Sequence, residues 1–291
     1  MQTELKNKIT QANSFIDEAF NPAHTGSFQL LMQLSLDNAL ITVYEKSNNK
    51  YIAFENYTFQ NIFTFDGLAE LLDALMNKSK LIKHKYKSVK CVIVNSLSTL
   101  VPNALYEEER KKMYLKFNTS LEGDEMVLTD DLKSMDAKNI FALHLSIKSK
   151  LDYQFQNISY HHVSSALIDT LVLQNKNQTD KKLVVHVQQT CFQVVVTDGK
   201  NLLFYNSFNY QTAEDFVYYL LFVCEQLQLN AETTELVLLG EIERNSTIYA
   251  LIQKYIRKVK FGERSDGAQY SYQLQTIPSH YYFTLFNNYY I

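Results

Sequence analysis

The feature of this sequence that most constrains its fold is an order of elements that occurs twice. In the first half, three apolar and β-branched segments predict antiparallel strands, and an amphipathic segment that follows Asp66 as N-cap predicts a helix. A near-continuous apolar run then predicts a strand that is covered on both faces, as in a parallel sheet. These strands are expected at 27–36, 39–45, 51–59 and 89–94.

The second half repeats this order step for step. Three strand patterns are joined by a tight Asp198-Gly199 hairpin, and a helix begins at Thr212 or Asp215. A buried strand follows and ends at Gly240. The strands are expected at 183–187, 192–197, 202–208 and 235–239.

This repeated order predicts an α/β protein with two ribonuclease-H-like domains in tandem, which is an actin-like ATPase fold with mixed sheets and helices on both faces. We expect an N-terminal leader helix in residues 1–26, a first domain at 27–178 and a second at 179–291. Additional elements are expected at 107–117, 125–128, 140–145, 146–155, 158–163 and 166–173 in the first domain, and at 246–256, 258–261 and 280–289 in the second.

Composition and charge narrow the compartment and the partners. A formal net charge of −3 gives no general attraction to nucleic acid. The start of the chain lacks the apolar core of a signal peptide, and the longest strongly apolar run, 216–224, is too short to span a bilayer. Cys91, Cys191 and Cys224 lie in apolar segments without metal-type spacing, so buried free thiols are expected. These features predict a cytoplasmic protein with no membrane span.

Three segments carry a resemblance to a known family. The chain resembles an uncharacterised bacterial domain-of-unknown-function family whose members have an actin-like ATPase fold and no established activity. The resemblance implies the fold and no catalytic role for any residue. The segments are Thr99-Leu100-Val101-Pro102 with Glu107-Glu108-Glu109, 239–243 with Tyr255-Ile256-Arg257, and His280-Tyr281-Tyr282-Phe283 with Leu285-Phe286-Asn287.

An actin-like fold makes ATP and Mg²⁺ the first ligands to consider. Such enzymes hold phosphates on two hairpin tips, where an Asp positions Mg²⁺ and a Gly lets backbone N–H groups approach the anion. The first tip here contains Asp37 and Asn38 but has Ala39 where the glycine is expected.

The other two places depart further from a nucleotide site. The second tip, Gln188, Gln189 and Thr190, has neither Asp nor Gly. Adenosine usually lies against paired glycines, and this chain offers Gly240 followed by Glu241. These tip residues and this turn are therefore candidates for lining a cleft between the domains, without an assigned cofactor or catalytic residue.

The sequence also lacks the residues for a nuclease site and for a histidine metal site. A ribonuclease-H-type nuclease needs converging carboxylates, and after Asp37 the next position falls on Asn95. His161 and His162 are adjacent on a strand and point to opposite faces, so we interpret them as edge or surface residues and not as chelators of one ion.

The remaining conspicuous segments favour structural interpretations. The lysine run from Lys78 to Lys90 is interpreted as a solvated face that protects a strand, with contact to a phosphate backbone or an acidic partner as its alternative. The aromatic tail with Tyr282, Phe286 and Tyr289 is expected to pack on the second domain, with docking of another protein as its alternative.

The sequence thus favours a protein without catalytic activity, which uses a degenerate actin-like fold to bind or scaffold an unidentified protein partner. The alternative is a weak Mg²⁺-dependent ATP-binding protein or ATPase that uses the inter-domain cleft, with Asp37 as its metal-side residue. The sequence leaves the oligomeric state open.

Overall fold

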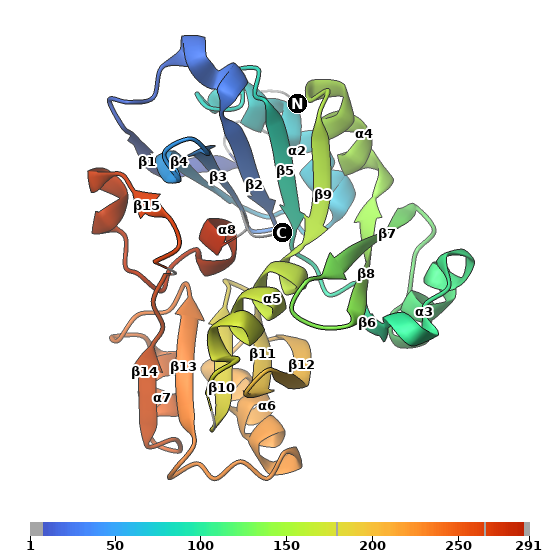
Figure 1. Cartoon of the computed structure of the whole chain (residues 1–291), viewed down its shortest axis with the longest axis vertical. Helices are drawn as coiled ribbons and strands as arrows, with labels where there is room; N and C mark the ends of the chain where they lie inside the picture. The colour runs from blue at the N-terminus through green and yellow to red at the C-terminus, as the bar shows by residue number, and fades with distance from the viewer. Residues whose placement is uncertain (1–7, 179, 265, 288–291) are drawn as a thin grey trace. The chain divides into compact units, whose positions relative to one another are not determined.

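The chain divides into two compact units, which are described separately. The computed structural model describes residues 8–178, 180–264 and 266–287 (Figure 1). The first unit comprises residues up to 132, 136–165 and 265–277, and the second comprises 133–135, 166–264 and 278 onward. The domain limits 27–178 and 179–291 stay predictions.

A mixed sheet forms the centre of the first unit. Its strand order is β1-β4-β3-β2-β5-β9, and β15 pairs with β4. The hairpins β2–β3 and β3–β4 are antiparallel, whereas β5 pairs parallel with β2 and β9 pairs parallel with β5. The strands are β1 Ile9–Ile16, β2 Gln29–Leu34, β3 Asn38–Glu45, β4 Lys50–Phe59, β5 Ser88–Ile93, β9 Ile158–His162 and β15 Gln269–Tyr270.

Helix α2 (Phe65–Lys78) buries its leucine face in the apolar core of this unit, with Leu71 and Leu75 fully covered. The prediction of Asp66 as the N-cap is wrong, because the N-cap lies two residues earlier. Thr64 caps the helix, because its Oγ1 accepts a hydrogen bond from Gly67 N at 3.1 Å. Helix α4 (Leu145–Gln154) contacts α2.

A smaller antiparallel sheet is inserted between β5 and β9. Its order is β6-β8-β7, formed by β6 Ser98–Pro102, β7 Glu125–Leu132 and β8 Ala137–His144. The element predicted over 107–117 consists of a short 3-10 turn, Glu108–Arg110, and helix α3 (Lys111–Asn118). Leu115 of α3 is buried in a small apolar cluster with residues of this sheet.

The second unit contains a sheet with the order β12-β11-β10-β13-β14. This is the order of β4-β3-β2-β5-β9 in the first unit, with the same antiparallel and parallel pairings. The repeated order predicted from the sequence is therefore confirmed. The strands are β10 Lys181–Val187, β11 Cys191–Asp198, β12 Asn201–Asn209, β13 Glu235–Gly240 and β14 Lys258–Phe261.

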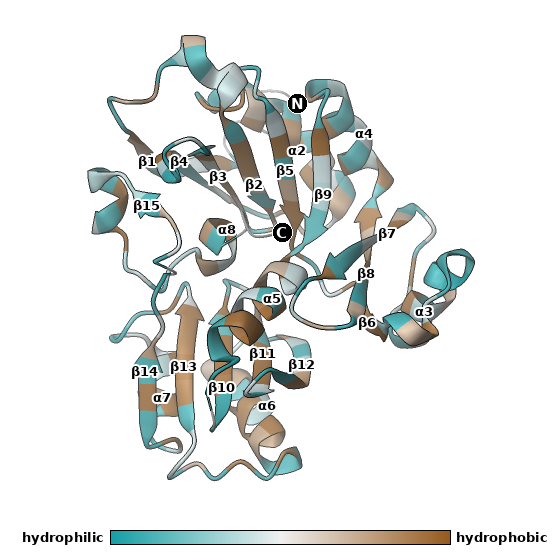
Figure 2. Cartoon of the chain, viewed as in Figure 1, coloured by the Kyte–Doolittle hydropathy of each residue, from teal (hydrophilic) through white to brown (hydrophobic). Residues whose placement is uncertain are grey.

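Helices complete the second unit. Helix α6 (Ala213–Gln226) begins at the predicted Thr212, which forms a capping box with Asp215. Helix α5 (Val163–Asn175) contributes Leu167 and Leu171 to an apolar cluster, and α7 (Thr247–Ile252) follows β13. Figure 2 shows β10, β11 and β13 as largely hydrophobic strands, as strands in the interior of a covered sheet should be.

The predicted leader helix is wrong for the described part of residues 1–26. Ile9–Ile16 form strand β1, which pairs antiparallel with β4, and Pro22–Ser27 form a 3-10 turn. Thr10, Asn13 and Ser14 are poor helix formers, and the open edge of β4 offers a complete ladder of backbone partners.

The described part of the aromatic tail packs as predicted, but its helix begins at Phe283 and not near His280. Helix α8 is described over Phe283–Asn287, and Tyr289 lies outside the described residues. Phe283 joins the cluster of Leu167 and Leu171 in the second unit. No helix in the described part of the chain is both long and apolar enough to span a bilayer.

Candidate functional site

The first predicted tip is the turn between β2 and β3, and its side chains bond within the turn. Ser35 Oγ accepts hydrogen bonds from Asp37 N at 3.1 Å and from Asn38 N at 2.9 Å. Ser35 N in turn donates to Asn38 O at 3.0 Å. The backbone N–H groups that a phosphate-binding tip presents to its anion are therefore already bonded to the serine hydroxyl.

The second tip, between β10 and β11, is held by a tyrosine from the end of β12. Tyr210 OH donates to Gln188 O at 2.7 Å, and Tyr210 N donates to Thr190 O at 3.1 Å. Gln188 N closes the turn by donating to Cys191 O at 2.9 Å. Gln189 and Thr190 are exposed at the apex, and no carboxylate stands in this turn to hold Mg²⁺.

A chain of side-chain hydrogen bonds extends from this tip into the sheet. Gln193 Nε2 donates to Gln188 Oε1 at 3.3 Å, and His186 Nδ1 donates to Gln193 Oε1 at 2.7 Å. His186 is buried, and burial lowers the pKa of its imidazole to about 4 despite the hydrogen bond to Gln193. The imidazole is therefore neutral at physiological pH and has a structural role.

Loss of the tyrosine hydroxyl tests how strongly the second tip is held. Tyr210→Phe keeps the ring contacts with Phe192 and Phe216 and removes the bond to Gln188 O. We expect the free energy of unfolding to fall by about 1 kcal/mol in a urea titration. Tyr218→Phe, at an exposed tyrosine of α6, is the matched control and should leave it unchanged; equal effects of both changes would contradict the role of Tyr210.

Gly240 ends β13 next to the second tip, because its partner in the parallel ladder is Val187. Its φ is +86°, and a Cβ at this position would lie 2.0 Å from Val187 O. Glu241 N donates to the same carbonyl oxygen at 2.9 Å. Glycine is required here by close packing of the protein backbone, which is a reason independent of any adenosine.

The C-terminal segment closes over this turn. Gly240 N donates to His280 O at 2.8 Å, and His280 Nε2 donates to Ile242 O at 2.8 Å. Burial lowers the pKa of His280, which favours the neutral ring that this donor arrangement uses. Tyr281 OH reaches Glu243 Oε1 at 3.2 Å. The turn predicted to receive adenosine thus bonds to the tail of its own unit.

The structure brings some of the predicted site residues together. Gln188, Gln189, Thr190, Gly240 and Glu241 lie at one end of the second sheet, since Gln188 directly follows Val187. Asp37 and Asn38 belong to the first unit, where they form the β2–β3 turn.

The sequence missed a polar cluster in the first unit, centred on Asp130 of β7. Asp130 Oδ2 accepts from His162 N at 2.8 Å and from Ser165 Oγ at 2.6 Å, and Oδ1 lies 2.9 Å from His161 Nδ1. This carboxylate is almost completely buried and joins β7, β9 and the start of α5. No simple spacing connects Asp130 with the histidines, so only the folded chain reveals the cluster.

His162 lies on the edge strand β9, as one of the two interpretations expected, but its side chain is fully buried, so the surface interpretation was wrong for it. Its Nδ1 lies 2.6 Å from Ser164 Oγ, and its Nε2 lies 3.2 Å from Asn95 O. Burial lowers the pKa of His162 to about 4, although Asp130 partly opposes this shift. Ser164 and His162 resemble a nucleophile and base, but both are inaccessible to any substrate, so the pair is structural.

The other residues considered for catalysis or metal binding form no catalytic or metal site among the described residues. Asn95 uses its amide internally, since Oδ1 accepts from Leu97 N at 2.8 Å and Nδ2 donates to Ala142 O at 3.0 Å. Cys91 and Cys224 are buried free thiols and Cys191 is half-buried. Among residues 8–178, 180–264 and 266–287, no three His, Cys, Asp or Glu side chains form a metal-binding group.

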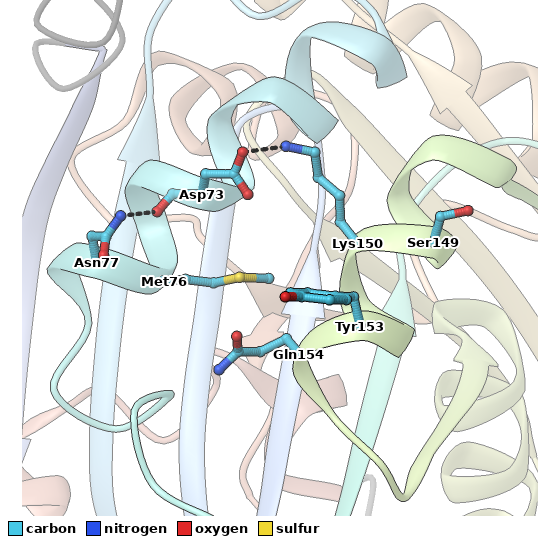
Figure 3. A pocket seen from close by; sticks show the side chains of 7 residues that line it. All are labelled: Asp73, Met76, Asn77, Ser149, Lys150, Tyr153 and Gln154. Atoms are coloured by element: carbon cyan, nitrogen blue, oxygen red, sulfur yellow. Dashed lines mark hydrogen bonds and ion pairs between the residues drawn. The ribbon is translucent and has the colours of Figure 1, made fainter.

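An open groove of about 460 Å³ lies between α2 and α4 (Figure 3). Lys150 of α4 forms an ion pair with Asp73 of α2 across it, and Asn77 Nδ2 donates to Asp73 O at 2.9 Å. Figure 3 shows the ring of Tyr153 beside the side chain of Met76. The charges of this groove are paired with each other, and none of the predicted site residues lines it.

Comparisons with known proteins identify the family of this chain and proteins with a similar fold. A family model described as a protein of unknown function, DUF3822, matches residues 17–259. A crystal structure from Bacteroides thetaiotaomicron VPI-5482, of a protein with actin-like ATPase fold and unknown function, is 24% identical with a TM-score of 0.77 and covers 86% of this chain and 95% of that one. A comparison with curated proteins gives no significant match.

A second similar structure is a PilM-PilN type IV pilus biogenesis complex. It is 11% identical with a TM-score of 0.61 and covers 90% of this chain and 98% of that chain. Together these structures show that the chain has an actin-like ATPase fold, as the repeated element order predicted.

Proposed function

Since this chain belongs to the DUF3822 family of proteins of unknown function, its own geometry must suggest the role, and we propose that it is a non-catalytic binding or scaffold protein. The observation that carries the proposal is the closed β2–β3 turn. Ser35 Oγ holds the N–H groups of Asp37 and Asn38, which an actin-like ATPase would offer to phosphate.

The second unit supports the same proposal. Its hairpin tip lacks a carboxylate for Mg²⁺, and Gly240 N is bonded to His280 O. A nucleotide would have to break these bonds before forming its own, and each broken buried bond costs about 1 kcal/mol or more. We therefore assign no cofactor and no catalytic residue to the chain.

We propose a protein as the binding partner and the cytoplasm as the compartment. The PilM-PilN complex, on the same fold, is an assembly of two different proteins, which gives a precedent at the level of fold. The free thiols of Cys91 and Cys224 fit a reducing compartment.

The alternative is weak Mg²⁺-dependent ATP binding or hydrolysis through Asp37. It is motivated by the position of Asp37 at the β2–β3 tip of an actin-like fold. In this alternative the carboxylate would hold Mg²⁺ beside the phosphates.

Calorimetric titration with Mg-ATP and a phosphate-release assay separate the two. We expect neither binding heat nor hydrolysis above buffer in the wild type, and the same in Asp37→Ala. Asp198→Ala is the matched control, because it removes a carboxylate from the hairpin β11–β12 of the second unit. Binding or hydrolysis that Asp37→Ala abolishes and Asp198→Ala retains would overturn the proposal in favour of the enzyme.

A further inference from the structure

Helix α3 presents an exposed stripe that is both apolar and basic. Met113 and Phe117 are one helical turn apart and exposed, Phe117 at 89%. Lys112 and Lys116 each precede one of these residues and form an adjacent exposed row along the helix, beside the face that Met113 and Phe117 form opposite the buried Leu115. The described residues supply no salt-bridge partner to either lysine, in contrast to Lys111 next to them, which pairs with Glu108.

Helix α6 of the second unit presents a stripe of the opposite charge. Tyr218, 65% exposed, and Phe222 are again one turn apart, and Glu214 and Glu225 flank them along the helix. All four lie opposite the buried face formed by Phe216 and its neighbours. In the described part of the chain, neither glutamate has a salt-bridge partner.

The two stripes have the same kinds of side chain but opposite charge. Each has two large exposed apolar side chains at the spacing of one turn and two unpaired charges, which are positive on α3 and negative on α6. Exposed apolar side chains accompanied by unpaired charge are typical of interaction surfaces, and opposite charges select the partner and its orientation.

We propose that α3 of one molecule docks on α6 of a second copy of this chain. The two stripes are different surfaces, so the contact is heterologous, and repeating it yields a head-to-tail chain or a closed ring. Two short helical stripes bury little area, so association is weak and depends on concentration and salt. This assembly does not depend on the proposed absence of nucleotide binding, and either proposal can fail without the other.

Sedimentation velocity of the full chain over a range of concentrations tests the proposal. We expect the weight-average sedimentation coefficient to rise with concentration at low salt and much less at high salt. A wild type that stays monomeric at every concentration would overturn the proposal. So would an oligomer whose size does not change with salt.

Charge reversal identifies the surfaces. The double variant Lys112→Glu/Lys116→Glu and the double variant Glu214→Lys/Glu225→Lys should each lower the association constant by about tenfold or more. Lys83→Glu/Lys85→Glu, at exposed lysines outside α3, makes the same change in charge and should associate like the wild type. Equal loss in this control would indicate a general effect of charge and contradict the proposal.

Mixing the two α3 and α6 variants gives the decisive result. In an equimolar mixture, the acidic α3 of one variant faces the basic α6 of the other, and the two unchanged stripes also match. We expect the mixture to regain wild-type association, although each variant alone stays monomeric. Failure of the mixture to associate, with both variants folded by circular dichroism, would show that α3 and α6 do not contact each other.

Discussion

Replacing Gly240 with alanine is expected to remove about 4 kcal/mol from the free energy of unfolding, a large share of the roughly 5–15 kcal/mol that is typical of a native protein. Two causes add. The φ of +86° disfavours any side chain by about 1–2 kcal/mol, and the new Cβ would lie 2.0 Å from Val187 O, far inside van der Waals contact distance. Relief requires β13 to move away from β10.

That movement would also break the bonds that close the turn. Glu241 N would lose Val187 O, and Gly240 N would lose His280 O, which leaves buried donors without partners. Phe283 follows in the same segment and would lose part of its packing in the cluster with Leu167 and Leu171. The local substitution thus spreads through the C-terminal tail.

The control Gly123→Ala separates the cost of a positive φ from the cost of a steric clash. Gly123 has a φ of +113°, but a Cβ there would meet nothing within 4 Å, so this change should cost only about 1 kcal/mol. Urea unfolding followed by tyrosine fluorescence and circular dichroism measures both variants, because the chain has 20 Tyr and no Trp. If Gly240→Ala were as stable as Gly123→Ala, the close approach to Val187 would not be the reason for glycine.

Acidification is expected to destabilise the protein steeply between pH 6.5 and 4, beginning well above the range in which most carboxylates titrate. Burial lowers the pKa of both His162 and His186 to about 4, whereas an unfolded histidine has a pKa of about 6.5. Below pH 6.5 the unfolded chain therefore takes up protons that the folded chain does not. Stability is complete above the unfolded pKa and falls as the pH is lowered toward the folded value.

The size of the effect follows from how the free energy of unfolding changes with pH. Each histidine removes about 1.4 kcal/mol per pH unit in this window, or roughly 2 kcal/mol between pH 6.5 and 5. Denaturant titrations at several pH values measure this slope in the wild type, in His162→Gln and in His186→Gln. Each substitution lowers stability at neutral pH. The effect that tests the account is a smaller dependence of the free energy of unfolding on pH, by the amount that one histidine contributes.

The two histidines serve as controls for each other because they lie in different compact units. We expect their effects on the slope to add in the double variant. If the units unfold in separate transitions, His162→Gln should flatten only that of the first unit and His186→Gln only that of the second. An unchanged slope in either variant would show that the corresponding imidazole is not held neutral in the folded state.

The sequence predicted the part of the fold that follows from periodic patterns. Alternating and continuous apolar runs located β2 to β5 and β10 to β13, and their repetition indicated the duplicated sheet. The start of α6 was predicted at Thr212 or Asp215, because N-cap residues are a local signal, and the structure shows that the two residues cap the helix together.

Elements stabilised by distant partners were missed. Strand β1 has little apolar alternation and exists because the edge of β4 is available, and β6 (Ser98–Pro102) similarly depends on pairing with β8. Sequence reasoning gave Asp66 as the cap of α2, although Thr64 two residues earlier performs that role.

The positions of the two candidate turns could be predicted, but the hydrogen bonds within them could not. The sequence located the turns at Asp37 and Gln188 and showed which residues are missing from them. It did not show that Ser35 Oγ closes the first turn, or that the carbonyl of His280 bonds to Gly240 N, because both depend on the direction of single groups after folding. His162 was missed for the same reason, since an edge strand exposes or buries a side chain according to what packs on it.

The most direct test of the central claim, that the turns of this actin-like fold are closed to nucleotide, is thermal unfolding with and without millimolar Mg-ATP. A ligand at about a hundredfold over its dissociation constant adds about 2.7 kcal/mol to the stability of the folded state. That gain would raise Tm by at least a couple of degrees for a chain of this size. We predict no shift, whether Mg²⁺ or a chelator is present. A rise in Tm that requires both ATP and Mg²⁺ and disappears in Asp37→Ala would contradict the claim and make Asp37 part of a working site.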